Sequence, residues 1–262
     1  QLNYYCVSLD TVSSRCKFDA KKYREVQRLV TTRHFCAKTA PPKRRVAGST
    51  PARGTIYFKS KYMTDTATST TDLQIAAIAG DGDAAFALGK QYDLAEGDAA
   101  ARKEAYRWYL LAAQGGHAEA CFAVGLLLNT GDGVPQDDAA ARVWFAKAAE
   151  QDIADAQFNL GLMYYIGEGG SKDFDAAANW FARAADQGHA KAQFNLGVMY
   201  LSGEGLKQDE VAVVKWWTLA AMQGHPGASA NLDAAIERLA PDQLRIVQEL
   251  TADWYSSVNK PF

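Results

Sequence analysis

Cysteine is scarce in this chain and unevenly placed. Only four cysteines occur among the 262 residues, three of them before residue 40 and the fourth at Cys121. The body of the chain is therefore not stapled by disulfides, which is typical of a reducing compartment. Long apolar runs are also missing. Neither a transmembrane helix nor the apolar core of a secretory signal is visible, so we expect a cytoplasmic protein.

The small net charge of −2 conceals two parts of opposite sign. Residues 1–62 contain 14 Lys and Arg against 3 Asp and Glu, whereas residues 63–262 contain 14 against 27. The chain therefore divides into a basic arm of charge +11 and an acidic body of charge −13. An acidic body repels phosphate groups, so we expect it to bind no nucleic acid and to prefer basic partners.

The basic arm, residues 1–62, has no sustained helical or strand period. Its segment Thr39–Arg53 contains three prolines and is predicted to be disordered, while Tyr23–Leu29 could form a short helix. Three interpretations remain open: a targeting segment, a nucleic-acid-binding tail, or a stretch foreign to the natural protein. We favour the third, with Met63 as the natural start, because the coherent pattern begins only after Met63.

From residue 82 onward the sequence repeats itself every 36 residues without insertion or deletion. Two columns fix the register, one of glycine and one of tryptophan. They are Gly89, Gly125, Gly161 and Gly197, and Trp108, Trp144, Trp180 and Trp216. The four units are 82–117, 118–153, 154–189 and 190–225. A fixed period of this length predicts a solenoid.

Each unit reads as helix, turn, helix. In the third unit, Gly161 lies inside the first helix, where glycine costs about 1 kcal/mol against alanine, and its recurrence suggests that two backbones approach closely there. The turn Gly167–Gly169 supplies the positive φ that ends this helix, and Asp173 is suited to cap the second helix. The recurrent His117, His189 and His225 follow glycine at the end of a unit, and we expect them to cap helix carbonyls rather than bind metal.

The two ends of the array depart from the repeat. Residues 63–81 contain a second helix without its first, as expected for an N-terminal capping half repeat. Residues 226–262 begin a fifth first helix and then break the pattern at Pro241. The final helix has Leu244, Val247, Leu250, Thr251 and Trp254 along one face, and is expected to cap the open end.

These residues resemble the Sel1-like repeats, relatives of the tetratricopeptide repeat. The resemblance covers Gly82–His225 through the pattern A-x-A-x-x-x-L-G-x-x-Y-x-x-G-x-G, followed by D-x-x-x-A-x-x-W and A-A-x-Q-G-H. It implies an all-α, right-handed α-solenoid of helix–turn–helix repeats with capping helices. It also implies a non-catalytic scaffold or adaptor, as in bacterial members, that binds a protein or peptide and needs no cofactor.

Two other functions stay open beside the scaffold. Some cysteine-rich Sel1-repeat proteins are described as β-lactamase-like hydrolases, but this chain lacks their cysteine pair in each repeat. The basic arm could instead bind nucleic acid. No nucleophile–base pair or metal-ligand spacing is apparent, so we expect neither an enzyme nor a metal site.

By analogy with related solenoids, the first helices should line the concave, partner-binding face. Gln157 and Asn159 recur as Gln193 and Asn195 on these helices, and an Asn side chain can both donate to and accept from a peptide backbone. The predicted peptide-binding residues are Gln157, Asn159, Tyr165, Lys191, Gln193 and Asn195. The alternative is that these residues bond within the repeat and fix helix packing.

Overall fold

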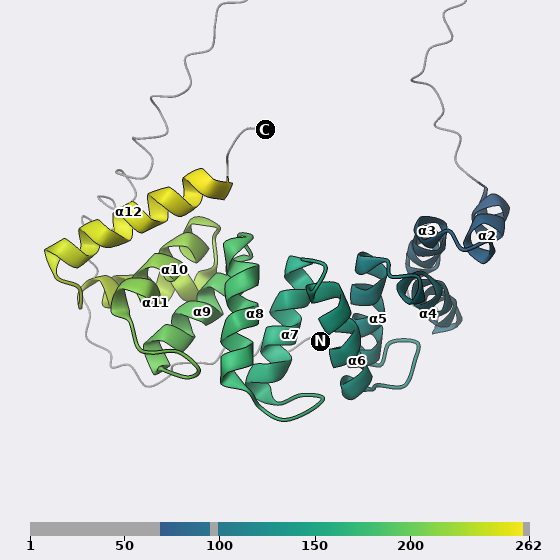
Figure 1. Ribbon diagram of the computed structural model, residues 1–262, viewed down its shortest axis with the longest axis horizontal. Coiled ribbons are helices and arrows are strands. Elements are labelled where there is room, and N and C mark those ends of the chain that lie inside the picture. The colour runs from purple at the N-terminus through teal and green to yellow at the C-terminus, as the bar shows by residue number, and fades with distance from the viewer. Residues whose placement is uncertain (1–68, 95–98, 259–262) are drawn as a thin grey trace, which may run out of the picture.

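The computed structural model describes residues 69–94 and 99–258, which form eleven α-helices and no strand (Figure 1). The helices follow one another along the array from α2 at one end to α12 at the other. The predictions for the basic arm, including Thr39–Arg53, Tyr23–Leu29 and Met63, lie outside the described residues. Within them, the prediction of an all-α solenoid is confirmed.

The helices alternate between the first and second positions of the repeat. The first helices are α3 (Gly82–Asp93), α5 (Ala118–Thr130), α7 (Ala154–Ile166), α9 (Ala190–Ser202) and α11 (Pro226–Ile236). The second helices are α4 (Ala99–Gln114), α6 (Asp138–Ala149), α8 (Phe174–Asp186) and α10 (Glu210–Met222). Before them comes α2 (Thr70–Ile78), and after them α12 (Pro241–Val258). Each helix packs against the next one along the chain up to α11, and α12 packs on α10.

The predicted aspartate caps are confirmed in three units. The side chains of Asp137, Asp173 and Asp209 accept a hydrogen bond from the backbone N–H three residues later, at 2.9, 2.9 and 3.0 Å. Each bond satisfies one of the donors that a helix start leaves unpaired, and such a cap is worth about 1 kcal/mol.

The glycine turns have two separate roles. Gly167 ends α7 in the left-handed conformation at φ 81°, as predicted, and Gly131 and Gly203 do the same for α5 and α9. The second glycine of the turn, Gly169, lies so close to the backbone of Asp138 that any side chain would collide with it. The turn of one unit is thereby packed on the start of the second helix of the unit before.

The glycine column marks a close approach, chiefly to an aromatic ring and, at Gly161, also to the backbone carbonyl of Ala177, 3.3 Å from an added methyl group. A methyl group on Gly161 would lie 2.8 Å from the ring of Phe181, and one on Gly125 would lie 2.7 Å from the ring of Phe145. Gly89 and Gly197 face Tyr109 and Trp217 in the same way. The first helix therefore rests on an aromatic ring of its own unit, and glycine leaves the room for that ring.

The histidines were predicted to cap the carbonyls at the end of the second helix, and this prediction is wrong. His117, His189 and His225 cap the N-terminus of the following first helix, where Nδ1 accepts the backbone N–H of Ala120, Ala192 and Ala228. The glycine before each histidine turns the chain at the end of one unit, so the imidazole reaches the start of the next. Each histidine ring also packs against a phenylalanine of the preceding first helix.

The last helix covers the end of the array. Val247 and Thr251 of α12 are buried, and Leu244 and Trp254 pack on the core, as predicted. Leu250 was predicted to lie on the same face but is 40% exposed.

Candidate peptide-binding site

Each first helix presents one row of exposed and partly exposed side chains. The row follows the spacing i, i+4, i+7, which places its members on one face of a helix. On α7 the row is Asp155, Asn159 and Leu162, and on α9 it is Lys191, Asn195 and Val198. Three of the predicted binding residues therefore lie on this face together with an aliphatic residue one turn further on.

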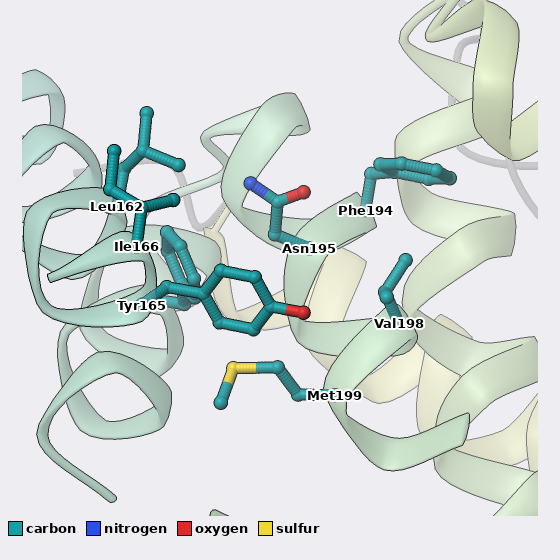
Figure 2. A pocket seen from close by; sticks show the side chains of 8 residues that line it. Leu162, Tyr165, Ile166, Phe194, Asn195, Val198 and Met199 are labelled. Atoms are coloured by element: carbon teal, nitrogen blue, oxygen red, sulfur yellow. The ribbon is translucent and has the colours of Figure 1, made fainter. Parts of the chain in front are cut away.

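A pocket of about 90 Å³ opens between α7 and α9 (Figure 2). Its lining is mainly apolar and comes from α7, α8 and α9. The lining residues are Leu162, Tyr165, Ile166, Phe181, Phe194, Asn195, Val198 and Met199. Two of the predicted site residues, Tyr165 and Asn195, are thus brought together at one cavity by helices 36 residues apart.

Asn195 differs from the other asparagines at its position in the repeat. Asn159 and Asn231 each donate from Nδ2 to the backbone carbonyl four residues earlier, at 2.7 Å. Within the described residues, the Asn195 amide has no hydrogen-bond partner, and Figure 2 shows it at the pocket beside the Tyr165 ring. It is therefore available to a ligand as both donor and acceptor.

Tyr165 connects the pocket to a carboxylate. Its hydroxyl donates to Glu204 Oε2 at 2.8 Å, across the boundary between the third and fourth units. Burial, together with this hydrogen bond and the Glu204 charge, raises the pKa of Tyr165 to about 12. The phenol therefore stays protonated at neutral pH and holds the Glu204 carboxylate near the cavity.

The structure places Gln157 and Gln193 in the interior, so they do not line the exposed face. Gln157 is fully buried, donates to the Ala149 carbonyl at 3.0 Å, and accepts from Gln187 at 2.8 Å. Gln193 is also fully buried and makes the corresponding bonds with Ala185 and Gln223. For these two residues, the geometry is that of the packing alternative.

Lys191 is exposed near the start of α9, one turn before Asn195. It occupies the place that Asp155 takes in the preceding unit, so the charge at this position changes sign between α7 and α9. Burial of the His225 imidazole lowers its pKa, and the positive charge of Lys191 lowers it further.

Sequence reasoning missed several residues at this site. Leu162, Ile166 and Val198 line the pocket. Glu204 accepts a hydrogen bond from Tyr165, which also lines it. Asn231 lies 36 residues after Asn195 and continues the asparagine column, but it does not line the pocket. The aliphatic residues gave none, because apolar residues on a repeat helix are indistinguishable from core until the helices are placed.

Neither a metal centre nor a reactive thiol emerges from the described part of the chain. No group of three or more His, Cys, Asp or Glu side chains is placed there to hold a metal ion. Cys121 is buried, its thiol lies 3.7 Å from the Ala113 carbonyl, and burial raises its pKa. Over the same residues, no helix is both long and apolar enough to cross a bilayer.

Comparison with known proteins gives one consistent family. The Sel1 repeat profile matches residues 82–117, 118–153, 154–189 and 190–225. Among solved structures, the chain is similar to c5321, a protective antigen present in uropathogenic Escherichia coli strains that displays an SLR fold, with 29% identity and a TM-score of 0.61. That similarity covers 72% of this chain and 40% of the antigen, so this chain spans less than half of that relative.

A second solved structure is a Sel1 repeat protein from Oxalobacter formigenes. It is 28% identical with a TM-score of 0.59, over 70% of this chain and 75% of that protein. No curated protein matches the chain.

Proposed function

Because the chain belongs to the Sel1 repeat family, whose members generally mediate protein–protein interactions, we propose that it is a non-catalytic scaffold that binds a segment of a partner protein across α7, α9 and α11. The observation that carries this proposal is the apolar pocket between α7 and α9, with the Asn195 amide at its edge.

The size of the pocket favours a peptide over a small metabolite. Sites for small molecules usually enclose about 300–1,000 Å³, several times the volume of about 90 Å³ here. A cavity of this size accepts one side chain. The Asn195 amide can then contact the backbone beside that side chain, because Asn159 and Asn231 donate to their own helices.

The proposal is tested by site-directed photo-crosslinking in cells that express the full chain. A benzophenone amino acid replaces Leu162 on the first-helix face in one variant. In the control it replaces Val143, which is 55% exposed on the second helix α6. We expect a discrete crosslinked protein with the probe at 162 and none with the probe at 143.

The Asn195→Ala substitution identifies the contribution of the amide. Loss of hydrogen bonds that form only in the complex should weaken binding by about 5- to 10-fold, while the folded protein keeps its stability. Equal crosslinking at positions 162 and 143 would place the interface elsewhere. So would an Asn195→Ala protein, with the probe at 162, that crosslinks as much as the protein with Asn195 when the partner is below saturation.

A further inference from the structure

An apolar stripe crosses three consecutive first helices and includes the pocket. It consists of Leu126, Leu162 and Val198, which occupy the same position on α5, α7 and α9. Leu126 is 36% exposed, and the other two are partly exposed. A chain that runs across the helices would meet one aliphatic side chain per unit.

Charged residues, most of them acidic, border this stripe on both sides. We call the residues seven positions before each aliphatic residue the helix-start row. They lie two turns earlier on the same face of the helix. This row is Glu119, Asp155 and Lys191, so it is acidic on α5 and α7 and basic on α9. Six residues after the stripe, in the glycine turns, lies the turn row, which is Asp132, Glu168 and Glu204. On α5 and α7 the surface thus alternates acidic, apolar and acidic, although Asp132 is ion-paired with Arg102 at 3.0 Å. On α9 the residue before the stripe is Lys191, and the acidic residue is Glu204.

The helix-start row is well exposed and paired only weakly. The side chains of its acidic members Glu119 and Asp155 are 59% and 67% exposed, and their ion-pair partners are His117 and His189. Burial lowers the pKa of His189, so that imidazole is mostly neutral near pH 7 and does not cancel the Asp155 charge.

Beside the pocket, Glu204 is the acidic group hydrogen-bonded to one of the lining residues, Tyr165. Its carboxylate accepts from the Tyr165 hydroxyl at 2.8 Å and from the Ser202 hydroxyl at 3.3 Å, both uncharged donors. Such donors orient a carboxylate without neutralising it. Since Tyr165 also lines the pocket, the apolar cavity and this negative charge lie side by side.

We infer that the bound segment is basic and is anchored by one aliphatic side chain, with a Lys or Arg within two residues of that anchor. This inference depends on the proposed function and identifies its partner chemistry. The anchor is Leu, Ile, Val or Met, because the cavity of about 90 Å³ is smaller than the cavity of about 150 Å³ that binds a benzene ring in another protein. Two residues of extended chain span about 7 Å, so a flexible Lys or Arg next to the anchor reaches Glu204.

Fluorescence anisotropy with the full chain tests this inference. The probe is a labelled nine-residue peptide with one central leucine, flanked on each side by lysines and ending in glycines. We expect the peptide to bind, and its affinity to fall about tenfold when the leucine is replaced by alanine. High salt should also weaken the binding, because it screens the charges. A peptide with glutamates in place of the lysines should bind at least tenfold more weakly.

Variants of the protein separate the two parts of the inference. Val198→Phe fills the cavity and should abolish the preference for leucine over alanine, while Glu204→Gln should lower the dependence on lysine. Val143→Phe, on the exposed surface of α6, is the matched control and should leave both unchanged. Circular dichroism confirms that each variant is folded.

The outcomes distinguish this inference from the proposed function. If the photo-crosslinked partner contacts position 162 through an acidic segment, or one without an aliphatic residue, the inference is overturned and the scaffold function stands. Equal affinity for the leucine, alanine and glutamate peptides overturns it as well. If no protein crosslinks at position 162, the proposed function fails first.

Discussion

Gly161 lies beneath the ring of Phe181 with no space for a methyl group. Helix propensity alone would favour alanine there by about 1 kcal/mol, so the glycine is retained against the local preference of the chain. The same opposition recurs in every unit of the array. Packing at one residue therefore fixes how closely the two helices of a unit approach.

The substitution Gly161→Ala should destabilise the protein by about 1–2 kcal/mol. Overpacking a core costs about 1–3 kcal/mol, and the gain in helix propensity offsets only part of it. Urea unfolding followed by circular dichroism measures the change. Gly82→Ala is the control, since a methyl group there lies 3.8 Å from its nearest neighbour. A Gly161→Ala protein as stable as the control would show that the ring moves away without cost.

At the scale of helices, the histidine caps couple the junctions between units to pH. Nδ1 of His189 and of His225 accepts a backbone N–H, which requires an unprotonated nitrogen. Burial lowers the pKa of both imidazoles below their ordinary value of 6.5, and Lys191 lowers that of His225 further. The Asp155 carboxylate acts in the opposite direction on His189.

The unfolding free energy should therefore fall as the pH drops below about 6.5. Below that pH the unfolded chain binds more protons than the folded one, so protonation favours unfolding. The effect ends once the pH is below the lowered pKa of the histidines in the folded protein. Urea unfolding between pH 7.5 and 5.5 measures this slope. His225→Asn keeps a helix cap but removes one titrating group, and should give a shallower slope. Identical slopes for the two proteins would show that His225 does not contribute.

At the scale of the whole molecule, α12 closes a core that would otherwise end open. In a solenoid each unit contacts only its neighbours, so a terminal helix has to cover the last apolar surface. Val247 is 1% exposed on this helix, whereas the adjacent Ile246 is 40% exposed. These neighbours allow a matched test of the cap.

Val247→Asp should destabilise the protein by at least about 3 kcal/mol, because it buries an unpaired carboxylate. Ile246→Asp should cost less than about 1 kcal/mol, because its side chain remains in contact with water. Thermal unfolding of both variants provides the comparison. Similar midpoints for the two would mean that α12 does not cover the core in solution.

Much of the fold could be predicted from the repeat. The 36-residue period, the aspartate caps and the glycine turns are local signals, and the structure has each of them where expected. The histidine caps were assigned to the wrong helix, because a residue between two helices carries no local mark of which end it serves.

The candidate site was predictable only in part. Asn195 and Tyr165 were identified from their positions on the first helices, and both line the pocket. Gln157 and Gln193 had the same periodic signal but point into the interior, where they bond the preceding helix end. Position in a repeat does not reveal which direction a polar side chain takes once the next unit packs against it.

The sequence by itself determined the family, the repeat period and the alternation of first and second helices, because these depend on spacings within about 36 residues. Only the tertiary structure decided what lies between units: the rings beneath the glycines, the Tyr165–Glu204 bond and the pocket between α7 and α9. The physical reason is that side chains of separate helices form these features. Their depth and charge are set by the distance at which the helices pack, which no single helix encodes.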